Sequence, residues 1–269
     1  MRSGVFIAGM LLALFGNVQA SAQSGKLTDD ALYKAETVVT GTGEAERMRG
    51  FREGAEEVAI KLTGNAGLAG RKQIEPILDG VAGLVAEHSY EDRMKGIPIH
   101  DEQGTRDRPH YLRITFDKAK FDAGLRKAGL RKWSERPPIV VWLGVRDTSR
   151  RYVLASDGPE GYGQREVLKD ISEKRGVPII LPSKGQIAVT YDSVQNRRWH
   201  LLEQETKKLG AEGVLAGVLE FDGNVGWNTR WALVSPRTKA RWSMKGVTFD
   251  VALKRAIERT AAAFAKTSK

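Results

Sequence analysis

The sequence has no cysteine among its 269 residues. Without thiols there is no disulfide framework, no thiolate zinc site and no cysteine nucleophile. The lipid anchor of bacterial exported proteins is excluded too, because it is attached to a cysteine at the cleavage site. The chain must therefore hold its fold by burying a hydrophobic core, and its length suffices for one large domain or two small ones.

The chain also lacks the common catalytic and nucleotide-binding motifs. There is no HExxH, no GxSxG and no Walker A sequence. Segment 70–72 (Gly-Arg-Lys) is followed by Gln73, where a phosphate loop needs Ser or Thr. Segment 41–43 (Gly-Thr-Gly) reads as a tight turn between a strand and a helix rather than a dinucleotide loop. We therefore expect no cofactor.

Residues 1–22 have the pattern of a cleavable signal peptide. Arg2 supplies a basic start, an uncharged apolar run follows, and residues 20–22 (Ala-Ser-Ala) form a small-x-small cleavage site. The apolar run is too short to span a bilayer, which needs about twenty residues. A buried N-terminal helix is the alternative. The pattern predicts export to the periplasm, with a mature chain that begins at Ser21 or Gln23.

The formal net charge is +10. A basic surface suits nucleic acid, anionic lipid headgroups or anionic cell-wall polymers. Predicted export argues against nucleic acid. The basic residues are also dispersed in pairs and form no block of about five or six like charges, the pattern of a binding tail. A solvated basic surface is the plain interpretation, and an anionic polymer or membrane surface is a further partner to consider.

Hydrophobic periodicity predicts an α+β protein with two small domains. Residues 23–135 read as a β-α-α-β-β-α unit, and residues 136–269 as an α/β unit with a three-stranded antiparallel meander and a final helix. The pair Pro137-Pro138 marks the boundary, since proline cannot continue a helix. We expect each sheet to be mixed or antiparallel, with helices mainly on one face.

Within these units the pattern predicts particular elements. The expected helices cover residues 48–62, 74–85, 193–209 and the C-terminal segment. The expected strands cover 32–40, 111–116, 139–145, 177–181 and the meander at 214–221, 226–234 and 240–245, with a polar loop over 146–163.

Four segments together resemble a bacterial family of exported proteins called domain of unknown function twenty sixty-six. They are residues 58–65 (VAIKLTGN), 111–117 (YLRITFD), 136–143 (RPPIVVWL) and 209–217 (LGAEGVLAG). That family has no established activity, so the resemblance implies export and assigns no catalytic residue. The order of elements in the second half also resembles small α/β modules of envelope accessory proteins, which by itself is a weak guide to function.

Three sets of side chains are candidates for a site. His88, His100 and His110 lie in or beside a polar loop with several carboxylates and are weak candidates for metal ligands, although we expect no metal. Trp227 and Trp231 alternate along one strand, which indicates either a core face or an aromatic binding surface beside Arg230. Arg150 and Arg151, in the loop after the first buried strand of the second domain, are candidates for contact with an acidic surface.

These features favour a non-catalytic binding or accessory module of the cell envelope with a protein partner. The predicted export, the full core pattern and the missing catalytic motifs support this interpretation. The alternative is a hydrolase or metal-assisted enzyme acting on envelope material, with a site at the loop that contains His88, His100 and His110. That alternative requires the three histidines to converge, because metal–nitrogen bonds are only about 2 Å long.

Overall fold

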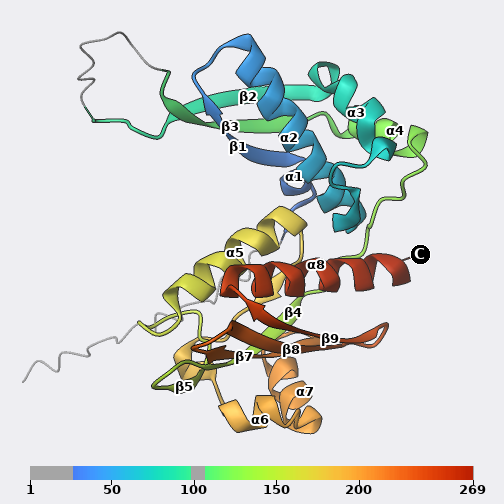
Figure 1. The fold of residues 1–269 in the computed structure, drawn as a ribbon. Coiled ribbons are helices and arrows are strands. Elements are labelled where there is room, and N and C mark those ends of the chain that lie inside the picture. Colours follow the sequence, from blue (N-terminus) through green and yellow to red (C-terminus); the bar gives the residue numbers. More distant parts are fainter. Residues whose placement is uncertain (1–26, 98–106, 269) are drawn as a thin grey trace, which may run out of the picture.

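A computed structural model describes residues 27–97 and 107–268 of the chain (Figure 1). The predicted signal peptide at residues 1–22 and His100 lie outside these ranges. The described residues form one three-stranded and one six-stranded sheet, flanked by helices. The predicted α+β class is confirmed. None of the described helices combines the length and the apolar character that crossing a bilayer requires.

The N-terminal sheet has the strand order β1-β3-β2 and is antiparallel throughout. Its strands are β1 (Lys34–Thr40), β2 (Val85–Asp92) and β3 (Pro109–Phe116). The helix α2 (Glu44–Thr63) packs along one face, where Gly50 and Gly54 allow close approach. A Cβ at Gly50 would lie 2.7 Å from the side chain of Leu112. Three shorter helices complete this half: α1 (Asp29–Leu32), α3 (Glu75–Asp79) and α4 (Lys118–Lys127).

The C-terminal sheet has the strand order β5-β4-β7-β8-β9, with β6 also paired to β4. Its strands are β4 (Ile139–Arg146), β5 (Arg151–Val153), β6 (Ile179–Ile180), β7 (Gly213–Asp222), β8 (Gly226–Val234) and β9 (Lys239–Val247). Strand β4 runs parallel to β6 and β7, and the other pairs are antiparallel. The meander predicted from the sequence is β7–β9.

Helices cover both faces of this sheet, as Figure 1 shows. On the face toward the N-terminal half lie α5 (Tyr162–Arg175) and α8 (Phe249–Thr267). On the opposite face lie α6 (Tyr191–Gln195) and α7 (Trp199–Lys208), which pack on β4 and β7. Strands β8 and β9 extend beyond these two helices, so part of this second face remains open.

The strands expected over 32–40 and 177–181 are shorter in the structure, and three further elements differ more strongly. The helix expected over 74–85 is the short α3 between two 3₁₀ turns, because Gly80 and Gly83 weaken a continued helix. The helix expected over 193–209 is broken into α6 and α7 at Arg197, whose φ of 51° lies in the left-handed region. The loop expected over 146–163 contains the short strand β5, which pairs with the end of β4.

The side chain of Arg136 joins the two halves. Its guanidinium donates one hydrogen bond to the carbonyl of Lys61 at 2.7 Å and another to the carbonyl of Gly176 at 2.6 Å. These carbonyls belong to the C-terminal ends of α2 and α5, where unpaired carbonyls favour a cation. The guanidinium carbon also lies 3.9 Å from the centroid of the Trp133 ring. Burial lowers the pKa of Arg136 to about 10.

Candidate functional site

A group of arginine side chains lies on the face of the C-terminal sheet that carries α6 and α7. The parallel strands β4 and β7 end side by side there, with Arg146 paired in register with Glu220. Side chains at the carboxyl ends of parallel strands commonly form binding sites, because loops diverge from that edge. We call the arginine side chains grouped here the arginine face: Arg146, Arg151, Arg197, Arg230 and Arg241.

Glu220 is the carboxylate around which this face is arranged. It forms ion pairs with Arg146 at 2.9 Å and with Arg230 at 3.5 Å. The hydroxyl of Tyr191 donates a hydrogen bond of 2.8 Å to the same carboxylate. Arg151 lies over the Tyr191 ring, with its guanidinium carbon 5.5 Å from the ring centroid. Burial and the bond to Glu220 raise the pKa of Tyr191 to about 12, so its hydroxyl remains a hydrogen-bond donor at neutral pH.

The remaining arginines of the face have no such counter-charge. In residues 27–97 and 107–268, no ion pair involves Arg151, Arg197 or Arg241. Burial lowers the pKa of Arg197, and repulsion from Arg241 and Arg230 lowers it further. Like charges held this close raise the local positive potential and favour an anion from outside.

Local sequence features explain why these side chains meet. Gly144 lies beneath the ring of Tyr191, where an added Cβ would be 3.0 Å from a ring carbon. Thr190 caps α6 by accepting a hydrogen bond from the Ser193 N–H at 3.2 Å, which fixes the start of that helix. The left-handed backbone of Arg197 then turns the chain between α6 and α7. A residue other than glycine in this region costs about 1 kcal/mol.

The structure places two of the four predicted binding residues on the arginine face. They are Arg151 and Arg230. Arg150 is exposed in the turn between β4 and β5 and lies 3.8 Å from the carboxylate of Asp147. Trp227 is on the other face of the sheet, partly buried between Phe221 and Phe249. The structure therefore separates the predicted tryptophan from the predicted arginines.

The neighbouring tryptophans belong to the core. Trp231 and Trp242 are cross-strand partners, and both are buried beneath α8. Trp231 packs on Gly217, where a Cβ would overlap its ring. This face of β8 and β9 offers no wide aromatic surface.

The histidine cluster is only partly within the described residues. His88 on β2 and His110 on β3 lie on either side of Tyr90, with ring centroids 5.7 Å and 6.1 Å from the tyrosine ring. The Nδ1 of His110 is 2.8 Å from the carbonyl of Arg108. His100 falls outside the described residues. Within the described part of the chain, no group of three or more histidine or acidic side chains is arranged to hold a metal ion.

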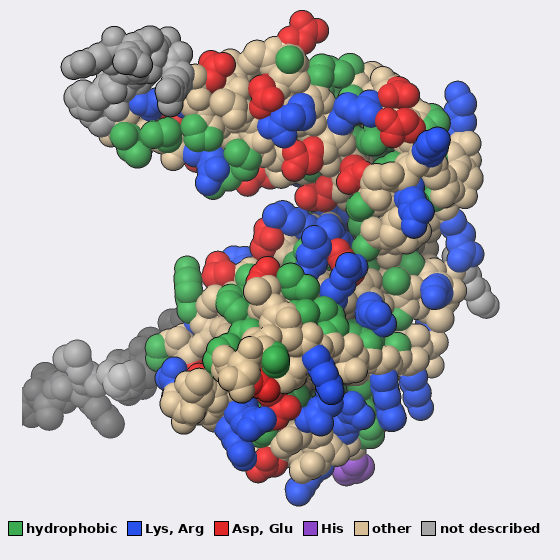
Figure 2. Space-filling view, in the orientation of Figure 1, with side chains coloured by type: hydrophobic (Ala, Val, Ile, Leu, Met, Phe, Trp, Pro, Cys, Tyr) green, Lys and Arg blue, Asp and Glu red, His purple; other side chains and the backbone are tan. Residues whose placement is uncertain are grey.

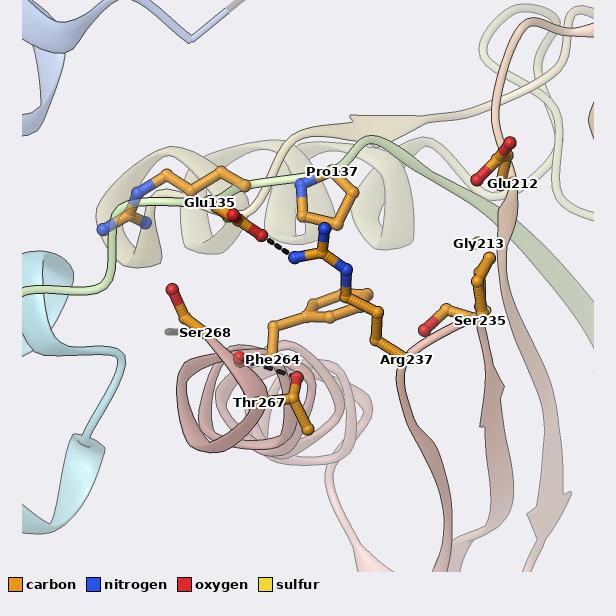
Figure 3. A pocket seen from close by; sticks show the side chains of 11 residues that line it. Glu135, Pro137, Glu212, Gly213, Ser235, Arg237, Phe264, Thr267 and Ser268 are labelled. Carbon is orange, nitrogen blue, oxygen red and sulfur yellow. Dashed lines mark hydrogen bonds and ion pairs between the residues drawn. The ribbon is translucent and has the colours of Figure 1, made fainter.

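A small pocket of about 360 Å³ lies at the opposite end of the C-terminal sheet (Figure 3). The side chain of Arg237 extends across Phe264 and forms an ion pair with Glu135. The hydroxyl of Ser268 lies 3.4 Å from the hydroxyl of Ser134. Glu135 and Arg237 neutralise each other, and the other two charged residues of the lining, Arg136 and Glu212, have opposite signs. The pocket therefore favours neither anions nor cations.

A larger cleft of about 760 Å³ separates the open face of the N-terminal sheet from α5 (Figure 2). Its walls carry charges of both signs, from Lys34, Glu36, Lys61, Arg113, Glu173 and Lys174 among others. Arg113 is already bound by Glu36 at 2.9 Å and Glu91 at 2.5 Å. Over the lower, C-terminal half of the molecule in Figure 2, Lys and Arg side chains are more numerous than Asp and Glu side chains. The arginine face remains the better anion site.

Comparison with known proteins finds a match in the N-terminal half of the chain. A family model described as a domain of unknown function (DUF8605) matches residues 28–134. These residues include the whole N-terminal sheet and end just before the linker to the second sheet. No curated protein matches the chain. The match is consistent with a domain-of-unknown-function family for residues 28–134, and it does not identify the family twenty sixty-six.

Sequence reasoning missed most of the arginine face. It did not select Arg146, Tyr191 or Glu220. Strict alternation along β7 and β8 could have separated these groups, since Glu220 and Arg230 have the opposite parity to Phe221 and Trp227. No sequence signal marks Arg197, because its position follows from the break between two helices.

Proposed function

We propose that this chain is a non-catalytic binding module of the bacterial cell envelope, whose arginine face binds an acidic segment of a partner protein. The observation that supports this proposal is the grouping of five arginines on one face of the sheet, of which Arg146 and Arg230 pair with Glu220. Three of these arginines have no ion-pair partner among the described residues. An acidic partner would supply the missing counter-charges.

The face itself shows how a carboxylate would be held. Glu220 accepts charge-assisted contacts from Arg146 and Arg230 and a hydrogen bond from Tyr191. Planar guanidinium groups match carboxylates in a two-pronged geometry, and arginine is enriched at protein interfaces. Asp and Glu side chains of a partner would bind Arg197 and Arg241 in the same way.

The envelope location is supported by the sequence. Residues 1–22 have the order of features of an export signal. The motifs at residues 136–143 and 209–217 support the finer assignment to the exported family twenty sixty-six. N-terminal sequencing of the protein from fractionated cells tests this part. We expect a periplasmic protein that begins at Ser21 or Gln23, and an intact Met1 in the cytosol would contradict it.

Binding to labelled poly-L-glutamate tests the arginine face. We expect measurable affinity that falls as salt rises, because exposed charges are screened over about 10 Å at 0.1 M ionic strength. The double variant Arg230→Glu/Arg241→Glu should lose at least tenfold in affinity, roughly 1.4 kcal/mol. The control Lys254→Glu/Arg259→Glu makes the same change in net charge on exposed positions of α8, the helix on the other face.

The outcomes separate specific recognition from general charge attraction. Loss of affinity in the first variant only supports the proposal. Equal loss in both variants shows attraction by net charge alone and contradicts it. Tighter binding to polyphosphate or to anionic lipid vesicles than to poly-L-glutamate contradicts the choice of a protein partner and favours an anionic polymer or membrane surface.

A further inference from the structure

Strand β9 forms an open edge of the C-terminal sheet beside the arginine face. It is the last strand in the order β5-β4-β7-β8-β9 and pairs with β8 alone. The hairpin between them closes with a hydrogen bond of 2.9 Å from the Ser235 N–H to the Thr238 carbonyl. Backbone groups alternate in direction along an antiparallel pair. The N–H and C=O groups of Lys239, Arg241 and Ser243 therefore point away from β8.

These outward groups have no partner in the described structure. No hydrogen bond outside the β8–β9 ladder involves the backbone of Lys239, Arg241 or Ser243, within residues 27–97 and 107–268. All three residues are exposed. A free edge of this length is a template for an added strand.

The outer edge of β1 is closed to a further strand, because side chains of α2 bind its outward backbone groups. The Lys61 ammonium donates to the Lys34 carbonyl at 2.6 Å, and Arg49 donates to the Val38 carbonyl at 2.8 Å. The N–H of Thr40 donates to Glu46 at 2.8 Å. Three side chains from α2 thus occupy three of the backbone groups that another strand would need. No side chain does this for β9 in the part of the chain that the structure describes.

The charge of the edges distinguishes β9 from β2. Strand β2 is also an outer strand, but it carries Glu87, Glu91 and Asp92, which repel an acidic segment. Strand β9 carries Lys239, Arg241 and Lys245. The side chains of Lys239 and Arg241 lie on the arginine face, because their cross-strand partners have the parity of Arg230.

We propose that β9 accepts an extended segment of the acidic partner as an added strand, with acidic and apolar side chains in alternation. This inference rests on the proposed function of the arginine face and names its mode of binding. The acidic side chains lie beside Arg241 on the arginine face. The apolar side chains lie on the other face, beside Ala240, Trp242 and Met244, which are partly or fully buried there.

The test uses a labelled peptide of alternating glutamate and valine residues, about six residues long, the usual length of a strand. The variant Ser243→Pro removes an outward N–H and opposes strand addition, while an edge strand tolerates proline. Ser243→Ala is the control. We expect Ser243→Pro to weaken binding about tenfold, as expected for one or two lost hydrogen bonds, and Ser243→Ala to leave it unchanged.

A second measurement leaves the protein unaltered. The same peptide with every backbone amide methylated keeps its charge but cannot donate hydrogen bonds, and we expect it to bind at least about tenfold more weakly. Equal binding of the methylated and unmethylated peptides overturns strand addition. If Arg230→Glu/Arg241→Glu still abolishes binding in that case, the result supports binding at the arginine face and rejects the added strand. If that variant also binds normally, both proposals fail.

Discussion

The hydroxyl of Tyr191 donates a hydrogen bond of 2.8 Å to the carboxylate of Glu220. This bond joins the short helix α6 to the end of β7 and holds the carboxylate between Arg146 and Arg230. Tyr191 can reach it because Gly144 leaves room for the ring on β4. The arrangement of the arginine face therefore depends on one aromatic side chain that packs against Gly144.

Replacing Tyr191 by phenylalanine tests the contribution of this bond. Tyr191→Phe keeps the ring beneath Arg151 and removes only the hydroxyl, so we expect the free energy of unfolding to fall by about 1 kcal/mol. Tyr162→Phe is the matched control, because Tyr162 is 66% exposed and its hydroxyl makes no hydrogen bond among the described residues. Urea denaturation measures both. An equal effect of the two substitutions would show that the bond to Glu220 contributes nothing.

Replacing Arg197 should change the stability of the fold and its affinity for an acidic ligand in opposite directions. Arg197→Gly relieves the left-handed backbone and the repulsion from Arg230 and Arg241, so we expect a gain of about 1 kcal/mol in unfolding free energy. The same substitution removes an arginine and should weaken binding to poly-L-glutamate. Arg197→Ala removes the charge without the backbone relief, and should lose affinity without the full gain in stability. A loss of stability in Arg197→Gly would contradict this account.

The stability of the junction between the two halves should depend on the two hydrogen bonds that the Arg136 guanidinium donates. Arg136→Lys keeps a positive charge, but a single ammonium cannot reach the carbonyls of both Lys61 and Gly176. We expect the unfolding free energy to fall by about 2 kcal/mol and the linker to be cut faster in limited proteolysis. Arg131→Lys, at an exposed position nearby, should have no effect. Unchanged proteolysis of Arg136→Lys would refute the role of this side chain.

The closed edge of β1 should depend on pH. Hydrogen bonds from Arg49 and from the Thr40 N–H lower the pKa of Glu46 from 4.5 to about 2. Because the folded state lowers this pKa, the carboxylate stabilises the fold above pH 4.5, and that contribution is lost as the pH falls toward 2.

Glu46→Gln should therefore unfold with a weaker pH dependence between pH 4.5 and 2 than the unaltered protein. Thermal unfolding across that range measures the difference. Glu44→Gln is the control, since Glu44 forms no ion pair in the part of the chain that the structure describes. Parallel pH profiles for the unaltered protein and Glu46→Gln would contradict the edge contact.

The sequence predicts the core of this fold well and its surface site poorly. The buried strand β4, the meander and the two long helices follow from hydrophobic periodicity, because their apolar positions repeat at the periods of strands and helices. The break at Arg197 and the shortness of α3 depend on local backbone geometry that periodicity does not carry. Arg151 and Arg230 could be selected by their charge. Glu220 could not, because its contacts with Arg146 and Tyr191 join segments far apart in the chain.

The most direct test of the central claim is an NMR titration of the protein with the alternating glutamate–valine peptide. It would follow the Nε–H signals of the arginine side chains and the backbone amides of β9. The account predicts shifts at Arg197, Arg230 and Arg241 and at the outward amides of β9, with little change on α8. Shifts confined to α8 or to the cleft beside α5, or no shifts at all, would contradict it.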